Sequence, residues 1–344
     1  MIEKRVYWGL LSTARINERL IPCFQRSARN ELIAVASRSQ AVANRYAEQH
    51  EIPRAYGTYE AMLEDSAIDA IYLSLPNALH VEWGVRCAEA GKHVLCEKPL
   101  ALSVEEVDRL AEAAKRHKVI IQEATMMRFH PQTTYIRNLV AQGTIGQVRM
   151  GRGLFTFTLE RPRDIRLDPA LGGGSVWDLG SYCVSFSRTV LQAEPVEVFG
   201  AQTEGDAGVD LSFSGHLLFS TGAFFHFYSS FAAFNQIEAD ILGTEGRVFL
   251  DMPWVTGVNQ SATVQVIRKD GTNNQSTFSD DLDNQKIEKQ IYENVNAYQD
   301  EVESMASSLL DGTPPVIPLS DSRANIAVVT ALYRSAREGQ IVKV

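Results

Sequence analysis

The chain has 344 residues, of which 45% are hydrophobic and 22% are charged, a composition typical of folded proteins rather than disordered or fibrous ones. Because a single hydrophobic core stops growing at roughly 250–300 residues, this length predicts two domains. The formal net charge of −9 argues against nucleic acid as a partner, since no basic run offsets the repulsion.

The cysteines, histidines and apolar runs argue against a disulfide-rich, a metal-binding and a membrane protein. The four cysteines are far apart and show no C-x-x-C spacing, which favours buried thiols in a reducing compartment. The seven histidines have no ligand-type spacing, so we expect no metal site. The apolar run Val6–Leu11 is too short for a signal peptide, and no stretch approaches the roughly 18–20 residues of a membrane helix. By elimination we expect a cytoplasmic protein with no membrane partner.

The first third of the chain alternates short apolar runs with helical patterns. The runs have the length of buried strands and lie at Val6–Leu11, Leu32–Ser37, Ala70–Leu75, His93–Glu97 and Val119–Glu123. Helical patterns occupy Ile16–Arg26, Ala41–His50, Leu79–Ala90 and Val104–His117, the last preceded by a capping box of Ser103 and Glu106. This alternation predicts an α/β Rossmann domain with a doubly wound parallel sheet over residues 1–124.

The pattern changes after Met127, where a helix at Pro131–Gln142 leads into consecutive strand-like segments. These segments are Val148–Glu160, Val196–Thr203, Leu211–Ser220, Gly222–Phe231, Ile237–Leu242 and Arg247–Asp251. Amphipathic helices over 285–311 and 320–338 close the chain. Consecutive strands without helices between them predict an α+β domain over residues 125–344 with a large, mostly antiparallel sheet.

The turn after the first strand has the form of a dinucleotide-binding turn. In Rossmann units, small residues let the main chain approach the pyrophosphate, and the following helix supplies free N–H groups. Here Ser12, Ala14 and Asn17 occupy the three positions that glycines take in the G-x-G-x-x-G fingerprint. We expect Ser12 to Ile16, including Thr13 and Arg15, to bind the cofactor, although an ordinary strand–turn–helix connection explains the segment as well.

The end of the second strand indicates which nicotinamide cofactor is used. NAD-binding units place an acidic residue there for the ribose 2′-hydroxyl, whereas a basic residue accommodates the 2′-phosphate of NADP. The chain has Ser37 and Arg38 at this point and no aspartate, which favours NADP and leaves NAD possible. Alternatively, Arg38 is a solvated charge at a strand end.

Two segments carry candidate catalytic groups. Glu97-Lys98-Pro99 ends the strand His93–Glu97, at the sheet edge where ligands bind in doubly wound folds, and the proline allows a cis bond. Downstream, Gly172-Gly173-Gly174 precedes a helical pattern in which Asp178 and Tyr182 share one face. Taken alone, each segment has an ordinary alternative: a surface tripeptide in the first case, and a capped helix with a half-buried tyrosine in the second.

Together, Glu97-Lys98-Pro99, the Gly172–Gly174 loop followed by Asp178-x-Gly180-x-Tyr182, and Arg128-Phe129-His130-Pro131 resemble the glucose–fructose oxidoreductase/inositol dehydrogenase (Gfo/Idh/MocA) family. Tyr182 stands where many members have histidine. With Arg166-Leu167-Asp168-Pro169, it resembles the branch of dimeric dihydrodiol dehydrogenases and NADP-dependent D-xylose dehydrogenases. The resemblance covers nearly the whole chain.

This resemblance implies Lys98 and Tyr182 as the catalytic pair, a cofactor lining that includes Pro76, Asn77 and His80, and an open-faced second-domain sheet used to form a homodimer or homotetramer. Glu97 is expected beside the cofactor and Asp178 beside the substrate or in a proton relay. For substrate binding, the candidates are Arg128, Phe157, Arg166 and Trp177. Phe155, Phe157, Trp177 and Phe227 can stack on a sugar ring, although strand aromatics are more often core residues.

The expected function is an NADP-dependent oxidoreductase acting on a hydroxyl or ketone of a sugar or polyol. Oxidising an alcohol requires removal of its proton as hydride leaves, and free tyrosine or lysine, with a pKa of ~10, is a poor base near neutral pH. A cation beside the phenol corrects this, so we expect Tyr182 as acid/base and Lys98 as its electrostatic partner. The alternative is a non-catalytic dinucleotide-sensing regulator on the same fold.

Overall fold

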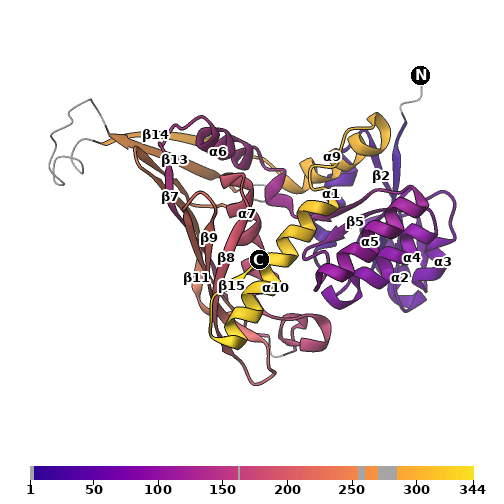
Figure 1. Ribbon diagram of the computed structural model, residues 1–344. Coiled ribbons are helices and arrows are strands. Elements are labelled where there is room, and N and C mark those ends of the chain that lie inside the picture. Colours follow the sequence, from indigo (N-terminus) through magenta and orange to yellow (C-terminus); the bar gives the residue numbers. More distant parts are fainter. Residues whose placement is uncertain (1–3, 162, 255–259, 270–284) are drawn as a thin grey trace. The chain divides into compact units, whose positions relative to one another are not determined.

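The computed structural model describes residues 4–161, 163–254, 260–269 and 285–344 (Figure 1). The chain forms two compact units. The first comprises Met1–Phe129, Ala170–Gly173 and Ala297–Ala327, and the second comprises His130–Pro169, Gly174–Asn296 and Val328–Val344. The domain boundary expected after residue 124 stays a prediction, and part of the C-terminal region belongs to the first unit.

The first unit is built on a six-stranded parallel sheet in the order β3-β2-β1-β4-β5-β6. Its strands are β1 (Val6–Leu11), β2 (Asn30–Ala36), β3 (Arg54–Tyr56), β4 (Ala70–Leu73), β5 (His93–Glu97) and β6 (Ile121–Ala124). The strand order reverses between β1 and β4, which is the switch point where doubly wound sheets bind ligands. The predicted Rossmann architecture is therefore confirmed.

Helices connect these strands at α1 (Asn17–Arg26), α2 (Gln40–His50), α3 (Tyr59–Leu63), α4 (His80–Glu89) and α5 (Val104–His117). At the start of α5 the Ser103 hydroxyl accepts from the N–H of Glu106 at 3.2 Å, as predicted. The Glu106 carboxylate accepts from the N–H of Leu102, one residue earlier than a standard capping box. The sequence patterns missed β3 and α3, which have only three and five residues.

The second unit is built on a nine-stranded sheet in the order β14-β13-β12-β11-β7-β10-β9-β8-β15, in which only the β10–β7 pair is parallel among the described strands. Its strands are β7 (Val148–Thr158), β8 (Pro195–Glu204), β9 (Asp210–Phe219), β10 (Phe224–Ser230), β11 (Ala232–Gly243), β12 (Gly246–Leu250), β13 (Ala262–Lys269), β14 (Gln285–Tyr292) and β15 (Val342–Lys343). The predicted mostly antiparallel sheet is confirmed.

Helices α6 (Pro131–Ala141) and α7 (Ser181–Leu191) lie along one face of this sheet (Figure 1). The side chains beneath them, including Phe225 and Phe227, are buried. The opposite face exposes large apolar side chains, among them Phe199, Phe224 and Tyr228. The chain closes with α9 (Ala297–Asp311) and α10 (Leu319–Glu338).

The predicted helix over 285–311 is wrong in its first part. Gln285–Tyr292 forms strand β14, which pairs with β13 in an antiparallel ladder, and the helix begins only at Ala297. Ile287 and Ile291 are four residues apart, a spacing that imitates one face of a helix. Pairing with β13 satisfies the main-chain groups on one side of this exposed edge strand, and tertiary context therefore overrides the local pattern.

Candidate functional site

The turn between β1 and α1 is closed by hydrogen bonds among side chains instead of by glycines. The Ser12 Oγ lies 2.9 Å from the Ser74 Oγ, which follows β4. Ser74 in turn donates to the Asn17 Oδ1 at 2.7 Å, and the Asn17 amide donates to the Ser12 carbonyl oxygen at 2.8 Å. Ser12 has a φ of 142°, a region that normally requires glycine, at the first glycine position of the fingerprint. This network holds the turn in the glycine-type geometry.

The same turn offers hydrogen-bond donors to an anion. The Ala14 N–H is bound by the Ser12 hydroxyl. Within the described residues, by contrast, the N–H groups of Arg15 and Ile16 have no acceptor, and they precede the first turn of α1. Free N–H groups and the positive end of a helix dipole bind phosphate oxygens. The donor set of this turn therefore fits the pyrophosphate of a dinucleotide.

At the end of β2, Ser37 is buried while Arg38 is exposed. The Ser37 N–H donates to the Tyr56 carbonyl oxygen at 3.0 Å, which fixes the main chain of this strand end. The Arg38 guanidinium has no carboxylate partner in the part of the chain that the structure describes. An exposed guanidinium at this place can receive a ribose phosphate.

Lys98 follows directly after β5 and is half-buried, and the Lys98–Pro99 bond is cis. The carboxylate of Glu97 accepts from the Tyr72 phenol and from the Lys98 N–H, the latter at 3.3 Å. Lys98 therefore lies at the carboxyl edge of the same sheet as the β1–α1 turn, and its main chain is anchored by its neighbour.

Two predicted cofactor residues after β4 also support this region. His80 is fully buried, with Nδ1 2.8 Å from the Pro99 carbonyl oxygen and Nε2 2.7 Å from that of Leu75. Burial lowers the pKa of His80, while the two carbonyl oxygens act against that shift. The Asn77 amide donates to the Gly172 carbonyl oxygen at 2.9 Å. His80 thus ties the β4 loop to the Lys98–Pro99 segment, and its contact with a cofactor stays a prediction.

In the second unit, a buried carboxylate organises the segment that carries Asp178. Asp210 Oδ2 accepts from the Ser175 hydroxyl at 2.7 Å and from the Val176 N–H at 2.8 Å, and Oδ1 accepts from the Tyr333 phenol at 2.5 Å. Val176–Gly180 is a π-helical turn that continues into α7. Such turns are rare and recur at functional sites. The predicted helix is confirmed, but its first turn is not α-helical.

Asp178 and Tyr182 have different surroundings. Asp178 Oδ2 accepts from the Arg166 Nε at 2.6 Å, and Arg166 also pairs with Asp164 at 3.1 Å. The two carboxylates, Asp178 first, raise the pKa of the Arg166 guanidinium. Tyr182 is buried in the first turn of α7, with its ring 5.6 Å from that of Phe155. The predicted residues Arg166 and Asp178 are therefore brought together as an ion pair.

The remaining predicted substrate residues have packing partners inside their own units. Arg128 is only 12% exposed and pairs with Asp321 at 2.7 Å. The rings of Phe157 and Phe231 are 5.5 Å apart, and those of Trp177 and Tyr333 are also 5.5 Å apart. These contacts account for the side chains without a ligand, so their roles in substrate binding stay predictions.

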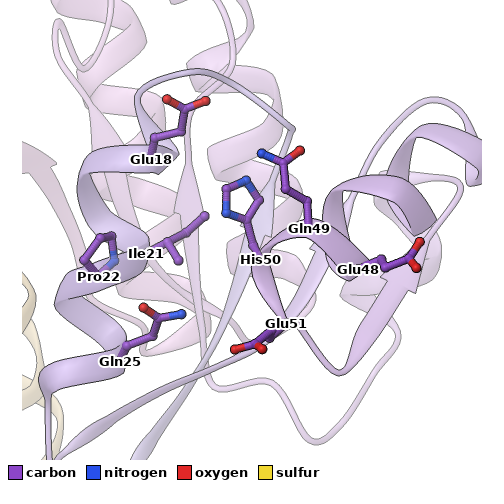
Figure 2. A pocket seen from close by; sticks show the side chains of 8 residues that line it. All are labelled: Glu18, Ile21, Pro22, Gln25, Glu48, Gln49, His50 and Glu51. Atoms are coloured by element: carbon purple, nitrogen blue, oxygen red, sulfur yellow. The ribbon is translucent and has the colours of Figure 1, made fainter.

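A hollow of about 540 Å³ on the first unit lies away from these residues (Figure 2). It is lined by α1 and by the C-terminal end of α2, including Pro22, Gln25 and His50. A neighbouring depression reaches Asn30, the first residue of β2, which places both hollows toward the amino ends of the strands. Ligands of doubly wound sheets bind at the opposite edge. We therefore do not assign this hollow to the cofactor.

The described residues contain neither a cluster of metal ligands nor a helix that could span a membrane. Among the described residues, no group of three or more histidine, cysteine or acidic side chains is arranged to hold a metal ion. In the same part of the chain, no helix has the length and apolarity needed to cross a membrane.

Comparison with known proteins shows which family has this sequence and fold. Residues 8–125 match the model of the Gfo/Idh/MocA oxidoreductase family with its NAD-binding Rossmann fold, and residues 133–249 match the Gfo/Idh/MocA C-terminal domain. The chain is 35% identical to D-xylose 1-dehydrogenase (NADP(+)) 2 of Haloferax volcanii, covering 98% of this chain and 99% of that protein. It is 36% identical to trans-1,2-dihydrobenzene-1,2-diol dehydrogenase of Danio rerio, covering 70% and 73%.

Among solved structures, the aldose-aldose oxidoreductase of Caulobacter crescentus complexed with glycerol superposes with a TM-score of 0.87 at 26% identity, covering 99% of this chain and all of that one.

Proposed function

The chain belongs to the Gfo/Idh/MocA oxidoreductase family, and from that premise we propose that it transfers hydride between NADP and a secondary or anomeric hydroxyl, or the corresponding ketone, of a sugar-like substrate. One observation carries the proposal. The carboxyl edge of the six-stranded sheet holds together the free N–H groups before α1, Arg38 after β2 and Lys98 after β5. Phosphate-binding and catalytic groups on one sheet edge are what a dinucleotide enzyme needs.

The preference for NADP rests on Arg38. A guanidinium binds phosphate oxygens through two parallel N–H groups, and the residues beside Arg38 include no carboxylate that would repel a 2′-phosphate. The Haloferax volcanii relative is named as an NADP enzyme, which supports the same choice.

The catalytic proposal divides the chemistry among three side chains. When bound, the nicotinamide supplies the hydride acceptor or donor. Tyr182 exchanges the proton with the substrate oxygen, and the Lys98 ammonium stabilises negative charge on that oxygen. Asp178, held by Arg166, orients a substrate hydroxyl. In the opposite direction the same groups reduce a ketone.

We further propose that the chain forms a homodimer or homotetramer through the open face of the nine-stranded sheet. Phe224 is 57% exposed on β10, and Phe199 and Tyr228 lie exposed on β8 and β10. Apolar side chains on an uncovered sheet face indicate an interaction surface. Sedimentation of the wild type and of a Phe224→Glu variant tests this: the wild type should be an oligomer and the variant should dissociate.

The experiment for activity is a comparison of NADP+ and NAD+ across aldoses, polyols and trans-dihydrodiols, with product identification. We expect turnover with NADP+ on at least one of these classes. Lys98→Ala should lower kcat by about 10²- to 10⁴-fold while cofactor binding, followed by NADPH fluorescence, is kept. Lys115→Ala, on the exposed face of α5, is the control. Normal kcat in Lys98→Ala would overturn the catalytic assignment, and cofactor binding without turnover of any substrate would favour a regulator.

A further inference from the structure

Three carboxyl groups and two phenols gather around the strand end that precedes Lys98, and all of them except the half-buried Glu97 are buried. Glu97 ends β5, Glu123 lies in β6 and Glu301 lies in α9, with Tyr72 in β4 and Tyr298 in α9. Glu301 is 1% exposed, Glu123 is 4% exposed and Tyr72 is fully buried. The charges of Glu97 and Glu123 both act on Glu301, and that of Glu301 acts on Tyr72 and Tyr298. These five groups form one acid–phenol cluster within the first unit.

The three carboxyl groups have unequal access to hydrogen-bond donors. Glu97 accepts from the Tyr72 phenol and from the Lys98 N–H. Glu123 accepts from the Leu100 N–H at 3.0 Å and from the Ser322 hydroxyl at 2.7 Å. The Oε1 of Glu301, in contrast, has no hydrogen-bond partner among the described residues. A buried carboxylate without donors is far less stable than one that accepts two hydrogen bonds.

Charges nearby act in the same direction. Burial, then Glu97 and Glu123, raise the pKa of Glu301 well above its usual range. Burial also raises the pKa of Glu123, although two hydrogen bonds and Arg128 act against that shift. Carboxyl groups that share one buried site do not all ionise, and the proton resides on the member with the fewest donors.

We infer that Glu301 is a positioning residue for Lys98. Because Glu301 is a neutral carboxylic acid, Glu97 can carry the negative charge and accept hydrogen bonds from the Tyr72 phenol and the Lys98 N–H. The role in catalysis rests on the proposed function of Lys98. Ionised Glu301 would place a second buried negative charge against Glu97, and repulsion would displace Glu97 from its two donors. Displacement of that strand end moves the ammonium away from the reacting oxygen, and misplacement by 1 Å can cost about 10²-fold in rate.

The protonation state is tested without activity. Infrared spectra of the wild type and of Glu301→Gln are compared at pH 7 in the C=O stretching region of protonated carboxylic acids. We expect a band in the wild type that shifts in D2O and is absent from Glu301→Gln. Glu112→Gln, at an exposed position of α5, is the control and should keep the band. Absence of the band from the wild type would overturn the inference.

The positioning role is tested by the contrast between two variants. Glu301→Gln keeps a neutral group of the same shape, so kcat should stay within about twofold of the wild type, whereas Glu301→Ala opens a cavity and should lower kcat about tenfold. The KM for NADP+ should change less than kcat in both variants. The positioning role would be overturned if Glu301→Gln and Glu301→Ala lowered kcat equally. It would also be overturned if Glu301→Ala left kcat unchanged. If Glu301→Ala does not fold, the infrared band and Glu301→Gln still decide.

Failure of this inference is distinguishable from failure of the proposed function. If Lys98→Ala retains turnover, the proposed function fails while the infrared band of Glu301 is still expected. If Lys98→Ala loses turnover and the band is missing, the inference about Glu301 fails alone.

Discussion

Two buried carboxyl groups, Glu301 in the first unit and Asp210 in the second, have similar exposure and different partners. Their exposed fractions are 1% and 2%, and burial raises the pKa of both. Asp210 accepts hydrogen bonds from Tyr333, Ser175 and the Val176 N–H, which counter the effect of burial on its pKa. Around Glu301 the nearby charges are two further carboxylates. The two groups therefore differ more in the number of hydrogen-bond donors around them than in their burial.

The difference has consequences for what each carboxyl group does. Asp210 accepts a hydrogen bond from the first N–H of the π-helical turn and so fixes the start of the segment that carries Asp178 and Tyr182. Glu301 serves its neighbours by remaining uncharged. The following substitutions break or sharpen this comparison, beginning with the largest expected effect.

Glu301→Gln should stabilise the protein by an amount that grows with pH. The folded pKa of Glu301 lies above the unfolded value of ~4.3, so between the two the folded state binds more protons and wild-type stability falls as pH rises. The amide removes this dependence, which has a limiting slope of about 1.4 kcal/mol per pH unit. Urea unfolding from pH 4.5 to 8 measures it. A difference between variant and wild type that does not depend on pH would show that Glu301 ionises normally.

Gly174→Ala should destabilise the second unit by about 3 kcal/mol, because strain and collision add. Gly174 has a φ of +129°, and a Cβ there would lie 2.2 Å from the Asp210 Oδ1 and 2.6 Å from the Tyr333 hydroxyl. Gly143→Ala is the matched control, because Gly143 also has positive φ but has open space around it. If the two variants unfold at the same urea concentration, the Asp210 cluster does not constrain the loop.

Asp210→Asn should cost about 2 kcal/mol at pH 7, since the charge-assisted hydrogen bonds lose strength. The same acid-to-amide change therefore destabilises one unit and stabilises the other. Asp206→Asn, at an exposed position before β9, is the control for a change in net charge. Equal stability of Asp210→Asn and wild type would mean that Asp210 is also protonated, and the contrast with Glu301 would disappear.

Sequence patterns predicted the local features of this molecule well. The strands Val6–Leu11 and His93–Glu97 and the helix Val104–His117 have the predicted bounds, because buried apolar runs and a capped amphipathic helix carry their own signals. Lys98 lies at the end of β5, as predicted. Strand β14 was missed because its register depends on β13, and its own spacing of Ile287 and Ile291 imitates a helix.

The residues that hold the candidate site in place were much harder to predict than the site residues themselves. Asp210 and Tyr333 are 123 residues apart, and no local pattern joins them. Glu301 lies in a helix whose sequence pattern predicts that polar side chains face solvent. Tertiary packing nevertheless buries Glu301 near Glu97. The Ser12–Ser74–Asn17 network likewise needs the adjacency of β1 and β4. Pairing of distant segments decides these contacts, and a single sequence does not display it.

The smallest effect is expected for Tyr333→Phe, which removes one of the three donors to Asp210 and should cost about 1 kcal/mol. Two donors, the Ser175 hydroxyl and the Val176 N–H, remain on the other oxygen and continue to favour the charged form of the carboxylate. The double variant with Asp210→Asn measures the coupling between phenol and carboxylate, which should be about 1 kcal/mol at pH 7. The coupling should fall as the pH is lowered and the carboxylate protonates, and because burial raises the pKa of Asp210 this loss begins at a higher pH than for an exposed aspartate. Zero coupling at pH 7 would mean that Tyr333 contributes through its ring contacts with Trp177 and Phe213 and not through its hydroxyl. In that case two donors suffice to keep a buried carboxylate charged, and the distinction from Glu301 rests on Ser175 and Val176 alone.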